Sequence, residues 1–448
     1  MLLADIKVLF IFLPLFLLII AFVPQKWKPA MLALCGIGYC ISTGWKALVF
    51  TLFSAIFGWF SVRCCPRTMT GTKAAKAMAW VVIDIIGQLI LLYFSSNVSC
   101  FITLIPAIQS IAAIFERING NFRVPSLPNY LAYCLSLPRI LGGIPLDFSE
   151  RNEIIRTRKF SIERTADGIQ HIVIGIFKIN VLSLPIGRFY TMICSPQTGQ
   201  YLTFLDAWMF AFAIFFMILF RLQGIQEIGQ GILLTLGYNI PDVFDSTVFS
   251  TSLRDFCKRI WTPMYRMGTK IFGLTDENIN DMSIFSYGLR IAGIIILPVC
   301  ILRRDSLHTS ICFCVFTLIL AITERVLKQK RLLDIIPHKI RIIVTNLCII
   351  ILCYTLFCDT PSGKISGIFS LIGKNGFLLS SYAKYAFSWY WSNFLLCVLC
   401  TFPIRKTITT LCDKYEKLEK ASIIVIPIVE LGLLTLSIMQ ILSSNVGL

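Results

Sequence analysis

Long apolar runs recur along the whole chain, and they restrict its fold more than any other feature. The first is VLFIFLPLFLLIIAFV, residues 8–23. Several runs reach about 18–20 residues, the length with which an α-helix crosses a hydrocarbon core of about 30 Å. The chain is 56% hydrophobic with a mean hydropathy of +0.77, which excludes an ordinary soluble domain. Further runs lie near residues 31–60, 78–96, 99–115, 169–185, 203–220, 284–301, 309–327, 340–357, 384–403 and 422–443.

The runs predict an all-α polytopic membrane protein with about ten to twelve membrane-embedded helices, some of them re-entrant or interfacial. No small-x-small cleavage site follows the first run, so we expect a membrane helix there and not a signal peptide. No Gly/Ser-rich or Pro-rich linker and no internal repeat divides the sequence. We therefore predict a single membrane domain over residues 1–448.

The net charge of +17 is carried by short loops between the apolar runs. Basic clusters lie at 63–76, 151–160, 325–331 and 414–420. Basic loops beside membrane spans are typical of cytoplasmic orientation and of contact with anionic lipid head groups. This placement predicts membrane lipids as partners and excludes nucleic acid.

Seventeen cysteines could suggest disulfides or a metal site, but most of them lie inside apolar runs. A buried thiol there acts as a small apolar side chain. No pair of Cys-x-x-Cys elements and no Cys/His spacing typical of zinc is present. The sequence predicts no metal and no resident cofactor.

Three polar gaps are long enough to hold structure of their own: 117–130, 147–168 and 239–284. The last mixes aromatic and charged residues, a composition that favours amphipathic helices at the membrane interface.

Polar side chains also intrude into the apolar surroundings of residues 220–238. Gln223, Glu227 and Gln230 are spaced by four and three residues, so they share one face of a helix. Gly224, Gly229 and Gly231 (in the same segment) would let another helix approach or would break this one. Ionisable groups inside membranes usually face a cavity or a partner. An interfacial helix with a wet polar face is the alternative.

Three segments, in this order, resemble a known family. YLAYCLSLPRILGGIPLDF (130–148) is similar to a segment of that family with a proline and then a glycine–proline pair before a polar residue. TRKFSIERTADGIQHIVIGIFK (157–178) is similar to a charged stretch leading into a helix that ends Gly-hydrophobic-x-Lys. RLQGIQEIGQGILLTLGYNIPDVFDSTVFSTSLRDFCKRIW (221–261) is similar to a run that begins Asp-Phe-Ser-Gly-Tyr-Ser-Asp and ends Phe-Trp-x-Arg-Trp-His. The matching residues are Pro138, Gly142, Gly143, Pro145, Phe160, Gly168, Gly175, Lys178, Gly224, Glu227, Gly237, Pro241, Phe244, Ser252, Phe256 and Arg259.

With these segments the chain resembles the membrane-bound O-acyltransferase superfamily over about residues 1–330. The closest resemblance is to the bacterial branch that contains alginate O-acetylation proteins and the D-alanyl transfer protein of teichoic acid. The resemblance implies membrane helices around a central cavity, where donor and acceptor meet through funnels from opposite faces of the membrane.

The departures from the family pattern affect the residues expected to carry chemistry. The Asp-Phe-Ser element is replaced by Arg221-Leu222-Gln223, and the Trp-His element by Trp261 or Thr262, depending on a one-residue gap. The second family histidine opens a membrane helix, and His308 stands at that place, 47 residues after Trp261. Alignment from Glu324-Arg325 would instead put Arg304 there.

The resemblance implies transfer of an acyl group from a thioester donor, acyl-CoA or an acyl-carrier protein, to a hydroxyl group. A hydroxyl attacks efficiently when a base takes its proton, and imidazole has a suitable pKa. We predict His308 as this base. His171, on the face of an apolar helix, and His338, in a basic loop, are not expected to take part. The other predicted site residues are Thr262, as a catalytic hydrogen-bonding group, and Gln223, Glu227, Arg259, Trp261 and Arg304, as the lining of the cavity.

Three classes of function remain open. The first is an active O-acyltransferase of the bacterial cytoplasmic membrane, modifying an extracytoplasmic polysaccharide or cell-envelope polymer, with a secreted or membrane-anchored envelope acylation protein as a partner. The second, favoured by the missing Trp-His element, is a degenerate relative acting as scaffold, acyl relay or lipid-binding partner. The third is an unrelated transporter or channel, which the ordered matches and the lack of repeated halves disfavour.

Overall fold

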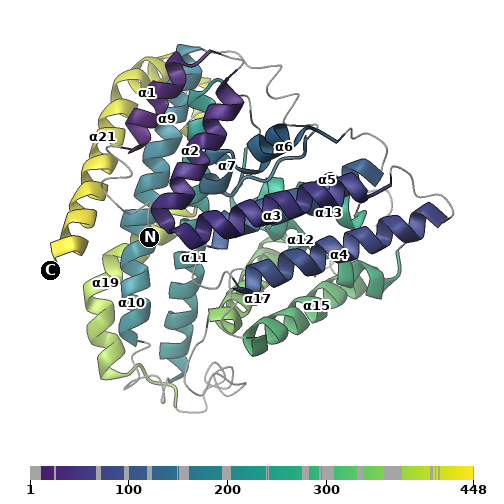
Figure 1. Ribbon diagram of the computed structural model, residues 1–448. Coiled ribbons are helices and arrows are strands. Elements are labelled where there is room, and N and C mark those ends of the chain that lie inside the picture. The colour runs from purple at the N-terminus through teal and green to yellow at the C-terminus, as the bar shows by residue number, and fades with distance from the viewer. Residues whose placement is uncertain are drawn as a thin grey trace.

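The computed structural model of the chain is helical in every regular element of the part that it describes (Figure 1). That part comprises residues 12–24, 27–66, 72–94, 100–118, 124–148, 150, 161–193, 203–238, 240, 242–274, 282–291, 294, 307–329, 337–357, 376–403, 407–408, 410–411 and 414–446.

Helix α11 (Phe204–Thr235) is the central element of the fold. Its 32 residues span about 48 Å at 1.5 Å per residue, longer than a hydrocarbon core. The helix starts with a capping box: the Thr203 hydroxyl accepts from the Asp206 N–H, and the Asp206 carboxylate accepts from the Thr203 N–H.

The two halves of α11 pack into different clusters of apolar side chains. The N-terminal half contacts α10 (Leu184–Ile193), α17 (His338–Phe357) and α19 (Ser381–Cys400). The C-terminal half contacts α7 (Leu137–Gly142) and α9 (Ile162–Phe177). A π-helical turn, η3 (Lys178–Ser183), joins α9 to α10 and also lies against α11.

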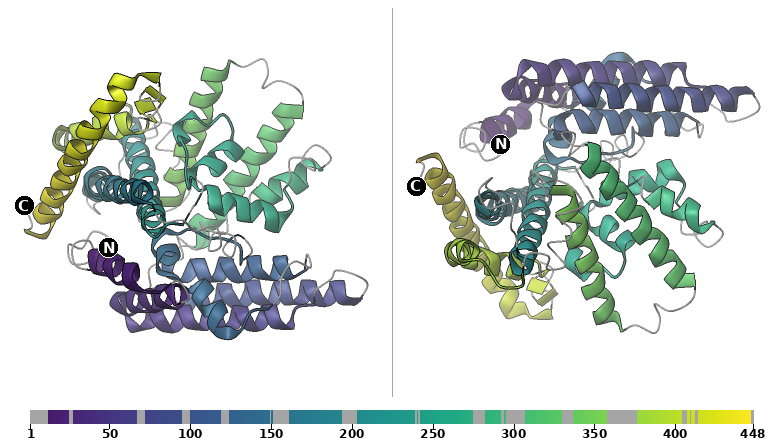
Figure 2. Two further views of the ribbon diagram at one scale, coloured as in Figure 1. Left: turned by 90° about the horizontal axis from the view of Figure 1, so that it is seen from above. Right: turned by 90° about the horizontal axis from the view of Figure 1, so that it is seen from below.

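The N-terminal helices form a layer on one side of α9 and α11 (Figure 2). In it α3 packs on α4, α5 and α6. The layer consists of α1 (Leu13–Phe22), α2 (Lys28–Thr43), α3 (Trp45–Cys64), α4 (Thr72–Phe94), α5 (Cys100–Ile118) and α6 (Leu127–Cys134).

The remaining helices lie on two other sides of the central pair (Figure 2). The C-terminal helix α21 (Glu416–Val446) packs along α9. A separate group contains the 3-10 turn η4 (Thr247–Phe249), α12 (Leu253–Ile260), α13 (Thr262–Phe272) and α15 (Leu307–Gln329).

Four of the described helical segments are long and apolar enough to cross a membrane. These are Trp45–Cys64, Ile162–Met192, Phe204–Thr235 and Ala421–Ser443. They support a multi-pass integral membrane protein, and the helical class predicted from the sequence is confirmed. The total of about ten to twelve embedded helices stays a prediction, since the run at 284–301 lies largely outside the described residues.

The polar gap at 239–284 was predicted to contain amphipathic helices, and α12 and α13 lie within it. Leu253 and Phe256 bury one side of α12, while Lys258 and Arg259 in its last turn stay partly exposed. The helical part of the prediction is confirmed.

Candidate functional site

The candidate site centres on Glu227, a buried carboxylate of α11 at the contact between this helix and α9. Its side chain is 4% exposed and accepts hydrogen bonds at both oxygens. The Nδ1 of His171 contacts Oε2, and because a carboxylate only accepts, this nitrogen is the donor. The ammonium of Lys178 donates to Oε1 at 3.0 Å. Helix α9 and the start of η3 thus bring two basic groups to one acid.

His171 and Lys178 converge because they are seven residues apart, two turns of helix, and so share one face. The sequence treated His171 as an uninvolved helix-face residue. It lies on the face of α9 that meets α11, where it is 8% exposed and contacts Glu227, and its absence from the chemistry stays a prediction. A lone histidine in an apolar helix gives no sign of its tertiary partner.

Glycines allow the two helices to approach this closely. A Cβ on Gly175 would lie 2.6 Å from the Gly224 carbonyl oxygen, and one on Gly224 would lie 2.8 Å from the Gly175 carbonyl oxygen. Gly168 and Gly231 face each other in the same way two turns away, with a Cβ on Gly231 falling 2.5 Å from the Gly168 oxygen. The prediction that Gly224 and Gly231 permit close helix approach is confirmed, and α11 continues unbroken past them.

The ammonium of Lys178 also lies over an aromatic ring, 4.3 Å from the centroid of Phe244. A cation–π contact in a desolvated place adds to the ion pair with Glu227. Burying an ionic group costs free energy unless the group is paired, so removal of one member leaves a charge buried without its partner. The three side chains therefore act as one electrostatic unit.

The predicted polar face of α11 is buried, not wet. Gln223, Gln226 and Gln230 are between 2% and 6% exposed, like Glu227 itself. Both side-chain polar atoms of Gln226 lack a hydrogen-bond partner. The alternative of an interfacial helix with a solvated face is thus wrong for this segment, and a functional role of these buried polar groups stays a prediction.

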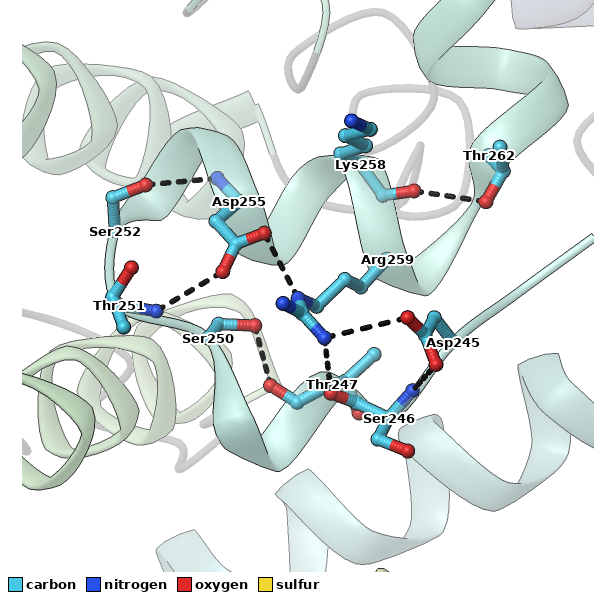
Figure 3. Close-up of polar contacts among 10 residues, drawn as sticks. All are labelled: Asp245, Ser246, Thr247, Ser250, Thr251, Ser252, Asp255, Lys258, Arg259 and Thr262. Carbon is cyan, nitrogen blue, oxygen red and sulfur yellow. Dashed lines mark hydrogen bonds and ion pairs between the residues drawn. The ribbon is translucent and has the colours of Figure 1, made fainter. Parts of the chain in front are cut away.

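Arg259, predicted to line the cavity, holds α12 to the loop before it (Figure 3). Its Nε donates to Asp255 Oδ1 at 2.8 Å, one turn earlier on α12, and its Nη1 donates to Asp245 Oδ2 at 3.4 Å. Asp255 also accepts from the Thr251 N–H at 3.2 Å, and its own N–H donates to the Ser252 hydroxyl. The guanidinium is engaged in positioning this loop.

Trp261 and Thr262, the residues at the place of the family's first histidine, connect three segments. The Trp261 indole N–H donates to the Gly143 carbonyl at 2.8 Å, and the Thr262 N–H donates to the Val243 carbonyl at 2.9 Å. The Thr262 hydroxyl donates to the Lys258 carbonyl at 3.0 Å (Figure 3). Val243 is followed by Phe244, whose ring contacts Lys178, so Thr262 is linked through this loop to the Glu227 cluster.

The other two predicted residues, His308 and Arg304, lie wholly or partly outside the described residues. His308 is the second residue of α15, but its side chain lies outside the described residues, and so does all of Arg304. Their roles stay predictions. Among the residues that are described, no group of three or more His, Cys, Asp or Glu side chains converges as metal ligands.

Comparison with known proteins shows a distant similarity to one group of bacterial proteins. Over 266 residues the chain is 22% identical to the probable alginate O-acetylase AlgI of Pseudomonas fluorescens, covering 56% of this chain and 52% of that protein. Over 283 residues it is 23% identical to the protein of the same description from Azotobacter vinelandii, covering 56% and 54%. This chain is a distant, divergent relative of these probable alginate O-acetylases. Those proteins belong to the membrane-bound O-acyltransferase superfamily, so the resemblance found in the sequence is confirmed.

This relative of the alginate O-acetylases spans about half the length of the curated proteins it matches. No protein-family profile matches the chain.

Proposed function

We propose that the chain is a membrane-bound O-acyltransferase of the bacterial cytoplasmic membrane. It moves an acyl group from a thioester donor, acyl-CoA or an acyl-carrier protein, to a hydroxyl of an extracytoplasmic polysaccharide or cell-envelope polymer. A secreted or membrane-anchored envelope acylation protein serves as its partner. Similarity to proteins described as probable alginate O-acetylases supports the reaction class.

In the proposed reaction, the acceptor oxygen attacks the thioester carbonyl carbon while the imidazole of His308 takes the hydroxyl proton. The new C–O bond forms, the C–S bond breaks, and the departing sulfur leaves as a thiol once it is protonated. His308 is the predicted base because of its place at the start of α15 in the family order.

The observation that best supports a reaction centre is the ionic unit of Glu227, His171 and Lys178 inside two apolar helices. Three titratable groups at membrane depth are costly, and such groups usually mark a pathway for substrate, ion or proton. We assign Glu227 and Gln223 to the wall of the reaction cavity. Thr262 and Arg259 hold the 242–246 loop beside it, through the hydrogen bonds to Val243 and Asp245, and Trp261 joins the start of α13 to Gly143.

Acyl transfer by membranes that contain the chain tests this proposal. With a labelled acyl thioester and a hydroxyl polymer as acceptor, His308→Ala should lower the initial rate by at least about 100-fold, the usual contribution of a general base. His338→Ala is the matched control, because His338 is exposed at the start of α17. An unchanged rate in His308→Ala would remove that residue from the mechanism.

A second function, a catalytically inactive scaffold or acyl relay, has its own supporting observation. The Trp261 indole and the Thr262 hydroxyl, which stand where the family has a histidine, both donate to backbone carbonyls of this chain. Both groups therefore serve the fold. Absence of transfer by the native protein with every donor tried, in membranes where its amount is verified, would favour the scaffold.

A further inference from the structure

Helix α3 of the N-terminal layer carries an aromatic and a basic side chain at each of its ends. Near its start, the Lys46 ammonium lies 6.0 Å from the centroid of the Trp45 ring. In its last turns, the Arg63 guanidinium lies 5.2 Å from the centroid of the Trp59 ring. Trp45 and Arg63 are separated by about 27 Å of helix, close to the thickness of a hydrocarbon core. Tryptophan and basic residues at both ends of an apolar helix are typical of the two membrane surfaces.

The C-terminal end of α3 lies beside the start of α4 (Figure 1). The rings of Phe60 on α3 and Trp80 on α4 meet edge to face, with their centroids 5.9 Å apart. Further from this end, the Ser54 hydroxyl of α3 donates to the Gln88 side chain of α4 at 2.6 Å. Since the contact moves backward along α3 as it moves forward along α4, the two helices are antiparallel.

Arg63 and Lys76 are exposed charges at this junction. Arg63 follows Phe60 by three residues and Lys76 precedes Trp80 by four, so each charge stands about one turn beyond the ring contact. In the ranges that the structure describes, no carboxylate forms an ion pair with either residue. Two positive charges on adjacent helices are therefore available to an anionic ligand.

The same end of the layer is strongly basic in sequence as well. Residues 63–76 contain four lysines and arginines and no acid, whereas residues 95–99, between α4 and α5, contain no charge. Arg117, in the last turn of α5, reaches this end and donates through Nε to the Cys65 carbonyl at 2.5 Å. Its neighbour Glu116 is the acid of that turn. The charge is thus concentrated at one end of the three helices, as is typical of the membrane surface that meets anionic lipids.

Apolar side chains continue from these charges along the outer faces of α3 and α4. Phe60, Met78 and Val82 are all exposed, within two turns of Arg63 or Lys76. A ligand with an anionic head and an apolar tail matches this sequence of charge and then apolar surface. An acidic protein in water would pair with the charges but would leave the apolar side chains beside them uncovered.

We propose that this end of the N-terminal layer, formed by α3, α4 and α5, is a binding surface for an anionic phospholipid. Arg63 and Lys76 bind the phosphate of the head group, and the acyl chains lie along Phe60 and Val82. Guanidinium and ammonium groups both donate charge-assisted hydrogen bonds to phosphate oxygens. A zwitterionic lipid is bound more weakly, because its own cationic group is repelled by the same two side chains.

Native mass spectrometry of the full chain tests this surface. The protein, purified in a neutral detergent, is mixed with equal amounts of phosphatidylglycerol and phosphatidylcholine that carry the same acyl chains. We expect the protein to retain phosphatidylglycerol at least about fivefold over phosphatidylcholine. Equal retention of the two lipids would overturn the proposal.

Variants locate the preference on the molecule. Arg63→Gln and Lys76→Gln should each weaken phosphatidylglycerol binding about fivefold, the usual contribution of one basic residue near an anionic membrane surface, and the double variant about 25-fold. The control removes two exposed lysines of α17 and α19, by Lys339→Gln with Lys384→Gln, and should leave the preference unchanged. A double variant that keeps the preference of the parent, or a control pair that loses as much, would refute the surface. Variants that bind both lipids like the parent but no longer bind an acidic acyl-carrier protein would assign these charges to a protein partner and would equally refute it.

Discussion

Replacement of Glu227 by Gln is the sharpest perturbation of the α9–α11 contact. The amide keeps the size of the carboxylate but removes its charge, so Lys178 is left as an unpaired ammonium at 12% exposure and His171 loses its acceptor. Breaking a buried pair by removal of one partner costs about 3–5 kcal/mol. For a chain of 448 residues, whose unfolding entropy is about 2.1 cal/mol/K per residue, we expect the unfolding midpoint to fall by about 3–5 °C.

The second member of the experiment is the double variant Glu227→Gln with Lys178→Met, which removes both charges. Since a neutral pair carries no uncompensated charge, this variant should unfold at a higher temperature than Glu227→Gln alone. The midpoint is measured in detergent by loss of the monodisperse peak after heating. Glu163→Gln, at an exposed acid in the first turn of α9, is the control and should change the midpoint by less than about 2 °C. A single variant as stable as this control, or a double variant no better than the single, would refute the electrostatic unit.

Three further predictions concern other contacts. Gly224→Leu should lower the unfolding midpoint far more than Gly38→Leu. A Cβ at Gly224 would meet the Gly175 carbonyl, whereas no atom lies within 4 Å of a Cβ at Gly38. Similar midpoints would contradict the close helix approach. Trp261→Phe should cost about 1–3 kcal/mol of unfolding free energy by leaving the Gly143 carbonyl without its donor, and an unchanged denaturant midpoint would show that the hydrogen bond contributes nothing. Lys270→Met should be destabilised more at pH 7.5 than at pH 4.5. Burial raises the pKa of Asp147 above its usual 3.8 even with the Lys270 ammonium beside it, so loss of that ammonium favours protonated Asp147 in the folded state, and the loss of unfolding free energy grows as pH rises through the titration of Asp147. A loss equal at both pH values would argue against the pair.

The helices that run through the middle of the fold could be predicted from the sequence because apolar length is a local property. The run at 203–220 lies in α11 and the run at 169–185 lies in the α9–α10 segment, and both helices could be predicted without knowledge of tertiary contacts. Glu227 was also predictable, since an acid inside an apolar stretch is conspicuous and its glycine neighbours indicate a close helix.

Partners in space could not be predicted in the same way. Nothing near His171 in the sequence connects it to Glu227, which lies 56 residues later, and the pairing depends on how the glycine faces of α9 and α11 meet. Asp84 of α4, within the run at 78–96, was not singled out for the same reason, because Ser110, whose hydroxyl donates to its carboxylate, reaches it only in the folded layer. Arg259 matched a motif in order, yet the structure uses its guanidinium to hold Asp245 and Asp255.

The acyl ester content of the cell envelope tests the central claim most directly. Cells that produce the chain together with a thioester-forming acyl donor are compared with cells that produce the Glu227→Gln variant at the same level in the membrane. If the chain is an O-acyltransferase, mass spectrometry of the envelope polymer should detect alkali-labile acyl esters with the parent and at least about tenfold fewer with the variant. Ester content equal to that of cells without the chain would contradict the assignment and leave a membrane scaffold.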